Sequence, residues 1–329
     1  MARGVKRVVK CLQYLKEIFM ACVAGAPSTF INAILAEDTK DHLEGIDYSV
    51  TTLLSSPREV QLIKRHKKEL PERNLSNRLA TFVGSAIHNA IENSVKGHPD
   101  YLIEYRMEFD EEVDGKTVKI AGTCDMYDKV NKRLIDHKTT TTFMYNTELK
   151  PEWVEQLNTY AYLLRRQGFE VEKLTINCIY KDWRPSAGRY KDGEYPEYPV
   201  MEFNFDPWPN DVAKDFYERK LREHVQAEPI EDAELPTCDI NHMWAKPSAY
   251  AVYRPGAAKA IRLLPSLKEA EQYIKNKKLD GCKIEHRVGE RTKCEKYCQA
   301  APFCNQFQKW KEEQNKELAE DILSGCSFS

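Results

Sequence analysis

Asp136 and Lys138 are the residues whose types and spacing most directly suggest chemistry. They lie two positions apart in the stretch RLIDHKTTTT (residues 133–142), which begins as a short β-prone run. Side chains two apart on a strand point to the same face, so the carboxylate and the ammonium share a face, with His137 on the opposite side. The pair could hold a cation or a water molecule and offset charge at a phosphorus centre.

A second acid joins this pair if the preceding strand forms a hairpin with it. A four-residue loop at Lys129–Lys132 places Asp125 directly opposite Asp136, with Cβ atoms about 5 Å apart. Two carboxylates this close repel unless a cation lies between them, and hard oxygen ligands suit Mg²⁺ or Mn²⁺. The alternative is that both acids are solvated residues flanking a turn, with Lys138 as their surface partner.

Two helical patterns extend the candidate site. In GSAIHNAIE, Gly84, His88 and Glu92 are four apart and share one helix face, where a neutral imidazole could bind a metal. In QLNTYAYLL, Gln156 and Tyr160 are also four apart. The alternatives are a histidine satisfied within a packed helix face and a helix with a polar edge.

In this order, the motifs resemble the PD-(D/E)XK nuclease superfamily, in its RecB-like exonuclease branch. The branch pattern is G-xxx-H-xxx-E, G-xx-D, D-x-K and Q-xxx-Y. The matching positions are Gly84, His88, Glu92, Gly122, Asp125, Asp136, Lys138, Gln156 and Tyr160. Phage-encoded members of the branch are similar from about residue 48 to 308.

The resemblance implies roles for these residues. The divalent ion would be bound by His88, Asp125, Asp136 and the backbone carbonyl of His137. Lys138 would help to activate the attacking water. Gln156 and Tyr160 would contact the DNA backbone or steady the site. Glu92 has the weaker claim, because this branch often uses the histidine instead.

Ten cysteines are unevenly distributed, with Cys294, Cys298 and Cys304 close together. On a helix the first two share a face, and Pro302 would break the helix and let Cys304 fold back. Clustered cysteines without a secretory context favour a metal or cluster. The spacing C-x₃-C-x₅-C is unlike the paired C-x₂-C of zinc ribbons, although Zn²⁺ and buried free thiols are both alternatives.

The resemblance also implies what these cysteines hold. RecB-like nucleases with a [4Fe–4S] cluster carry three cysteines near the C-terminus and a fourth before the nuclease core. Here the upstream position reads Ser56-Pro57. We therefore expect Cys238 to be the fourth ligand, with Cys282 second. The cluster would be a structural staple that orders a DNA-binding surface.

Helices and strands that would position these residues can be read from periodicity and turn signals. Helices are expected over 80–96, 151–167 and 211–227, and strands over 101–110, 116–128, 132–140 and 174–183. This order predicts an α/β fold, a restriction-endonuclease-like mixed central sheet flanked by helices, with a C-terminal cysteine-rich extension. The expected domains are a helical arm (1–40), the nuclease core (41–235), the cysteine-rich extension (236–310) and a tail (311–329).

Composition limits the remaining possibilities. The chain has 329 residues, 42% hydrophobic and 30% charged, with a net charge of −2, so DNA contacts would need a local basic patch. No apolar run approaches a membrane span, Lys16 and Glu17 argue against a signal peptide, and a phosphate-binding loop is absent. Candidate DNA contacts are Arg58, Lys64, Arg65, Lys67 and Lys68, and candidate stacking residues are Trp153, Tyr180 and Trp183. The alternatives are a solvated helix face for the cations and core packing for the aromatic residues.

The expected function is a metal-dependent DNA exonuclease of phage recombination or DNA processing, acting in the cytoplasm of a host cell. A phage recombinase or single-strand-binding protein is a possible partner, and no membrane is involved. The alternatives are a non-catalytic DNA-binding accessory protein on the same scaffold and a structure-specific endonuclease.

Overall fold

The computed structural model describes residues 44–71, 75–186, 193–324 and 327–328, together with positions 27, 29, 31, 33 and 34. The expected helical arm over 1–40 lies almost wholly outside these residues. The chain divides into two compact units, one of Met1–Leu54 and Arg73–Val225, the other of Ser55–Glu72 and Gln226–Ser329. Ser55–Glu72 thus groups with the cysteine-rich part of the chain, whereas the sequence placed it in the core.

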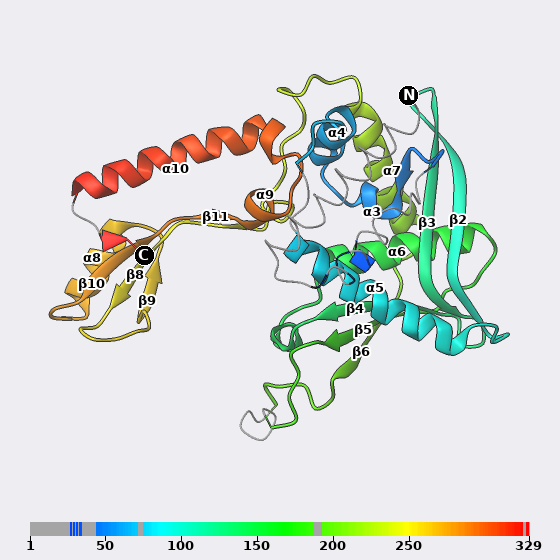
Figure 1. Ribbon diagram of the computed structural model, residues 1–329, viewed down its shortest axis with the longest axis horizontal. Helices are drawn as coiled ribbons and strands as arrows, with labels where there is room; N and C mark the ends of the chain where they lie inside the picture. Colours follow the sequence, from blue (N-terminus) through cyan, green and yellow to red (C-terminus); the bar gives the residue numbers. More distant parts are fainter. Residues whose placement is uncertain are drawn as a thin grey trace. The chain divides into compact units, whose positions relative to one another are not determined.

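The first unit is built on a six-stranded mixed sheet (Figure 1). The strand order is β1-β3-β4-β5-β6, with β2 also paired to β3; β1–β3 and β4–β5 are parallel pairs and the others are antiparallel. Its elements are β1 (Tyr48–Ser49), α3 (Val50–Leu53), α5 (Leu75–Val95), β2 (Tyr101–Val113), β3 (Lys116–Asp128), β4 (Arg133–Thr140), η1 (Thr142–Asn146), α6 (Pro151–Arg166), β5 (Lys173–Tyr180), β6 (Val200–Phe205) and α7 (Asn210–Ala227). The predicted restriction-endonuclease-like sheet flanked by helices is confirmed.

The β3–β4 hairpin has the register expected from the sequence. Met126 pairs with Ile135 and Asp128 with Arg133, which leaves a four-residue loop between the strands. The Asp128 carboxylate accepts hydrogen bonds from the backbone N–H groups of Val130 and Asn131 at 3.1 and 3.0 Å. This aspartate-stabilised turn fixes the register, so Asp125 and Asp136 occupy the next position on each strand, directly beyond the last recorded pair, Met126 and Ile135.

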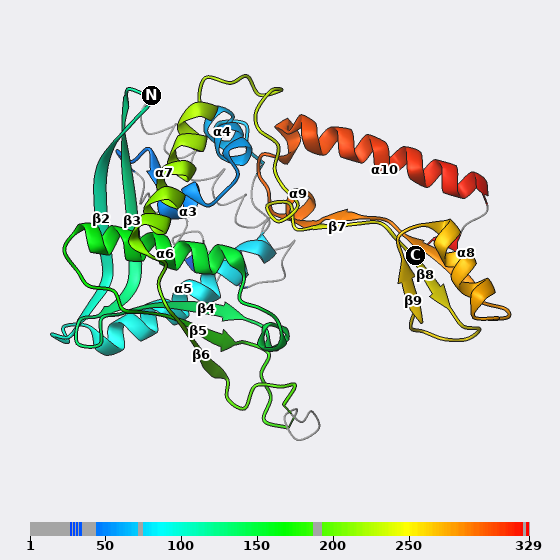
Figure 2. The ribbon, with the colours of Figure 1, turned by 180° about the vertical axis from the view of Figure 1, so that it is seen from behind.

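Two helices pack on the strands that carry the motifs. α5 contacts β2, β3 and β4, and α6 contacts β3 and β4, as both Figure 1 and Figure 2 show. α6 begins with Pro151 in its first turn and is anchored by Leu157, Leu163 and Leu164, each no more than 1% exposed. Burial of such a side chain contributes roughly 1.5–3 kcal/mol, which holds the polar residues of α6 at fixed positions beside the sheet.

The second unit combines helices with a four-stranded sheet of order β12-β10-β8-β9. Its elements are α4 (Pro57–Arg65), β7 (Ala245–Lys246), β8 (Ala249–Tyr253), β9 (Arg262–Leu264), α8 (Leu267–Asn276), β10 (Lys283–Arg287), β11 (Glu290–Arg291), α9 (Thr292–Lys296), η3 (Ala301–Phe303), α10 (Asn305–Ser324) and β12 (Ser327–Phe328). α10 is one continuous helix across the expected boundary at residue 310. In the described parts of the chain, no helix is both long and apolar enough to cross a bilayer.

Candidate active site

Lys138 lies at the centre of the candidate site. Its ammonium donates to Asp136 Oδ1 at 3.1 Å and to Gln156 Oε1 at 2.8 Å. Asp136 Oδ2 forms an ion pair with the same ammonium at 2.9 Å, is buried, and accepts no hydrogen bond from the described residues. The expectation that Asp136 and Lys138 share a face is therefore met, and one buried carboxylate oxygen still has the capacity to bind a cation.

Asp125 and His88 meet beside this pair. Asp125 Oδ2 accepts a hydrogen bond from the backbone N–H of His137 at 2.9 Å and lies 3.4 Å from His88 Nδ1. The other ring nitrogen of His88, Nε2, is 2.6 Å from the backbone oxygen of His137. The imidazole thus lies between two of the oxygen atoms that the sequence had assigned to a divalent ion.

The electrostatics of Asp136 fit an ion-binding role. Asp136 is 4% exposed. Burial raises its pKa to about 6 in spite of Lys138, and the neighbouring Asp125 carboxylate adds to the increase. A buried carboxylate in this state is stabilised by any nearby cation.

The described residues include no group of three His, Cys, Asp or Glu side chains arranged to hold a metal ion. Nevertheless, the donors present suit Mg²⁺ or Mn²⁺, because carboxylates and a backbone carbonyl are hard oxygen ligands. Such an ion would use Asp136 Oδ2, which is buried and has no recorded hydrogen bond, and the Asp125 carboxylate, which lies beside His88.

Gln156 contacts both Lys138 and Tyr160. Gln156 Nε2 donates to the Tyr160 hydroxyl at 3.4 Å, while Gln156 Oε1 holds the lysine. Tyr160 is only 5% exposed, and its ring lies against Gly122, where an added Cβ would be 2.9 Å from Tyr160 Cε1. This arrangement favours the steadying role over direct contact with DNA.

Glu104 is a candidate that the sequence analysis missed. It lies between Ile103, which pairs with Met126, and Tyr105, which pairs with Cys124, so that it stands across from Asp125. Its φ of +46° is uncommon for a residue other than glycine and is often found at functional sites. Partial burial, followed by the Glu92 and Asp125 carboxylates, raises its pKa to about 7. Only the β2–β3 register reveals this position.

Three of the candidate DNA contacts have structural roles. Arg58 is 2% exposed, and its guanidinium binds the carbonyls of Leu235 and Pro236 and the Asn305 side chain, so it is structural. Arg65 binds Asp232 and two backbone carbonyls. Tyr180 is 3% exposed, as expected for core packing.

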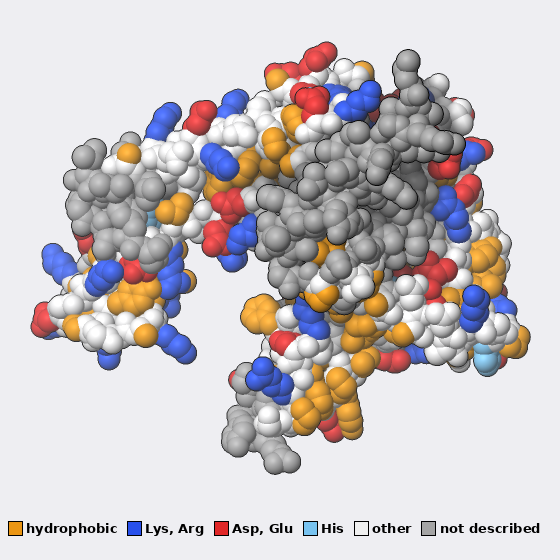
Figure 3. Space-filling view, viewed as in Figure 1, with side chains coloured by type: hydrophobic (Ala, Val, Ile, Leu, Met, Phe, Trp, Pro, Cys, Tyr) orange, Lys and Arg blue, Asp and Glu red, His pale blue; other side chains and the backbone are white. Residues whose placement is uncertain are grey.

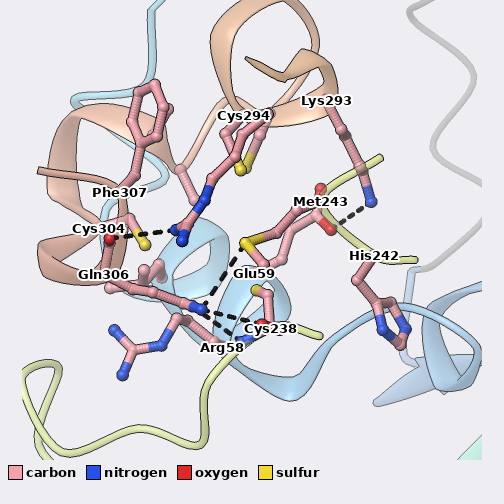
Figure 4. A pocket seen from close by; sticks show the side chains of 15 residues that line it. Arg58, Glu59, Cys238, His242, Met243, Lys293, Cys294, Cys304, Gln306 and Phe307 are labelled. Carbon is pink, nitrogen blue, oxygen red and sulfur yellow. Dashed lines mark hydrogen bonds and ion pairs between the residues drawn. The ribbon is translucent and has the colours of Figure 1, made fainter. Parts of the chain in front are cut away.

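The four predicted cofactor cysteines line one pocket in the second unit. Cys238, Cys294, Cys298 and Cys304 surround it together with residues of α4, α9 and the start of α10, and Figure 4 shows three of their sulfur atoms around this space. Burial raises the pKa of Cys294 to about 11, and Cys238 and Cys304 add to the increase. Cys282 instead packs in the core beside β8 and β10.

Ser56 occupies an informative position beside this pocket. Cys238 Sγ donates to Ser56 Oγ at 3.1 Å, and Ser56 is 1% exposed. The residue that replaces the upstream cysteine of the resembled nucleases is therefore in contact with the cysteine expected to substitute for it. The Cys238 backbone is held from both sides by the Gln306 amide, at 2.8 and 2.9 Å.

The mixed sheet flanked by helices places two acids and a lysine at the β3–β4 hairpin, as the PD-(D/E)XK pattern predicts. Comparison with protein families gives a match to the PD-(D/E)XK nuclease superfamily over residues 49–305, and the chain belongs to this superfamily. Comparison with curated proteins gives no match.

Two solved structures are similar to parts of the chain. SSO0001 has 19% identity and a TM-score of 0.41, with 58% of this chain and 82% of that chain covered. A phage related exonuclease from Haemophilus somnus 129PT has 12% identity and a TM-score of 0.30, with 50% and 76% covered.

Proposed function

We propose that the protein is a divalent-metal-dependent DNA exonuclease. The observation that carries the proposal is the ammonium of Lys138, held by Asp136 and Gln156 next to Asp125 and His88. Superfamily membership supports phosphodiester hydrolysis. The exonuclease assignment rests on the order of the four motifs from Gly84 to Tyr160.

The chain's own residues would bind and orient the reacting groups. Asp125, Asp136, His88 and the His137 carbonyl would hold Mg²⁺ or Mn²⁺, which when bound supplies Lewis-acid stabilisation of the charge that develops on the phosphate. A water oxygen attacks phosphorus, and the bond to the leaving alcohol oxygen breaks on the opposite side.

Lys138 contributes the second part of the mechanism. An ammonium has three N–H donors, and the recorded bonds to Asp136 and Gln156 use two. The third can stabilise the attacking water or the developing phosphate charge, and a preorganised donor of this kind is worth about 10²–10³ in rate. Gln156 and Tyr160 keep that donor in place.

Digestion of end-labelled linear duplex with Mg²⁺ or Mn²⁺ tests the proposal. Lys138→Met and Asp136→Asn should abolish release of label, while Lys173→Met, a change at an exposed lysine of the adjacent strand β5, should retain it. Equal activity of Lys138→Met and Lys173→Met would refute the assignment. Cleavage of covalently closed circular DNA would show that the protein is an endonuclease rather than an exonuclease. DNA binding without any cleavage would favour the non-catalytic accessory role.

For the cysteine pocket we propose a [4Fe–4S] cluster, held by Cys238, Cys294, Cys298 and Cys304. The donor set supports it, because four thiols line one pocket and thiolates are the ligands that such clusters use. The bound cluster would cross-link α9, the segment from Cys298 to Cys304 and the segment at Cys238. Anaerobically purified protein should then contain iron and absorb near about 400 nm.

A cysteine pair provides the control for the cluster. Cys298→Ser should lose the iron and the absorbance, whereas Cys282→Ser should keep both, because Cys282 packs elsewhere. Stoichiometric zinc would replace the cluster by a zinc site, and absence of both metals would refute it.

In the cell, we propose that the nuclease processes DNA in the cytoplasm of a phage host, with a recombinase or single-strand-binding protein as partner.

A further inference from the structure

Charge is unevenly distributed along the chain. Residues 249–287, which contain β8, β9, α8 and β10, include nine Lys and Arg and four Asp and Glu. The whole chain has 49 Lys and Arg and 51 Asp and Glu, so the remaining residues include 40 Lys and Arg and 47 Asp and Glu. Residues 249–287 therefore have a net charge of +5, whereas the rest of the chain has a net charge of −7.

The excess of positive charge comes from two stretches of this segment, residues 254–261 and 275–283. We call these two stretches the basic tip. Figure 3 shows Lys and Arg side chains gathered on this lobe. The tip has a single acid, Asp280, and its basic side chains are all exposed. They are Arg254, Lys259, Lys275, Lys277, Lys278 and Lys283.

Tertiary contacts bring the two stretches of the tip together. Tyr253 at the end of β8 pairs with Lys283 at the start of β10. An added Cβ on Gly281 would lie 3.2 Å from Pro255 Cγ, so the turn before β10 touches the loop after β8. α8 ends at Asn276, directly before this turn. The cations of the helix end, the loop and the strand therefore share one surface.

Helix capping explains only part of this cluster. Lys275 and Lys277 near the end of α8 offset the helix dipole. Arg254, Lys259 and Lys283 belong to other elements and have no such role. Within the described residues, the only ion pair of the tip joins Lys283 to Glu285 at 3.3 Å. Like charges gathered with so few acidic partners repel one another, and a polyanionic ligand would relieve this repulsion.

We propose that the basic tip binds the phosphate backbone of the DNA substrate. This inference rests on the proposed function, because it takes DNA as the polyanion. Contacts from exposed lysines and arginines to phosphates provide affinity without sequence readout, and they weaken with salt. The tip would supply the local basic surface that an overall net charge of −2 requires.

A salt titration of DNA binding tests the proposal. Binding of a fluorescent 30-bp duplex is measured by anisotropy without divalent ions, so that no cleavage occurs. The tip variant is Arg254→Gln/Lys277→Gln/Lys278→Gln. Its matched control is Lys214→Gln/Arg219→Gln/Arg222→Gln, three exposed cations of α7 with recorded acidic partners and the same change in charge.

In the tip variant, the slope of log K against log salt should become less steep by about 2–3. Binding near 0.1 M salt should weaken at least about tenfold. The control should change the slope by less than one. The single variants Arg254→Gln and Lys278→Gln, each expected to lower the slope by about one, decide the matter if the triple variant does not fold.

The outcomes separate this inference from the proposed function. If the wild type cleaves DNA but the tip and control variants bind alike, the tip does not contact DNA and the inference is overturned. If the wild type binds DNA through the tip but cuts nothing, the inference stands and the nuclease proposal fails.

Discussion

Gly122→Ala is the substitution for which the structure gives the sharpest expectation. A Cβ at this position would lie 2.7 Å from Val50 Cγ2 and 2.9 Å from Tyr160 Cε1, both closer than real Cβ contacts allow. Val50 is fully buried and Tyr160 is 5% exposed, so neither side chain can move into solvent. Overpacking of this kind costs about 1–3 kcal/mol.

Gly84→Ala is the matched control, since both glycines belong to the motifs. A Cβ on Gly84 would meet only Thr139 Oγ1, at an ordinary 3.6 Å. The residue lies inside α5, where alanine is favoured over glycine by about 1 kcal/mol. The two variants should therefore change stability in opposite directions.

Thermal unfolding followed by circular dichroism measures the difference. For a unit of about 200 residues, 1 kcal/mol shifts Tm by roughly 2–4 °C. Gly122→Ala should lower Tm by about 2–12 °C, and Gly84→Ala should raise it by about 2–4 °C. Gly122→Ala should also reduce cleavage, because Tyr160 supports Gln156 and hence Lys138.

Equal stability of the two variants would show that the packing of Val50 and Tyr160 against β3 is not as described. The double variant Val50→Ala/Gly122→Ala provides a second test. It removes the shorter of the two clashes, so it should be less destabilised than the sum of the single variants. Strict additivity would contradict the contact.

Three further predictions follow from the site and its surroundings. Because burial raises the pKa of Asp136 to about 6, Mn²⁺ affinity measured by calorimetry should fall about tenfold from pH 7 to pH 5, and a flat profile would argue against Asp136 as a ligand. Because of the same raised pKa, the folded metal-free protein binds this proton more tightly than the unfolded chain does. The contribution of Asp136 to the free energy of unfolding should therefore increase as pH falls from about 6 to 4. Asp136→Asn should remove that pH dependence in urea titrations. Arg58→Ala should destabilise the second unit by about 2–4 kcal/mol in urea unfolding, because it leaves buried carbonyls without a donor, while DNA affinity stays within about twofold; a selective loss of DNA binding would restore Arg58 as a DNA contact.

Much of the candidate site could be predicted because its geometry is local. The two-residue period of a strand places Asp136 and Lys138 on one face, and the length of the loop before Arg133 sets which acid stands opposite. The helix period likewise predicts that Gln156 and Tyr160 lie together, as they do. The order of these motifs was sufficient to indicate the superfamily.

Contacts between distant segments could not be read in this way. Periodicity marked Arg58 as one cation on a basic helix face, but packing against the segment at Leu235 buries it. Glu104 carries no motif, and only the pairing of β2 with β3 brings it opposite Asp125. The close fit of Gly122 against Tyr160 and Val50 depends on three separate elements meeting.

The sequence by itself determined the chemistry available, the hairpin register and the family. Tertiary structure alone decided that Lys138 is held by Gln156, that four cysteines from two segments line one pocket, and that the excess positive charge of residues 249–287 gathers at one tip. The reason is physical: strand and helix periods act over a few residues, whereas the meeting of remote segments is chosen by how their buried surfaces pack together.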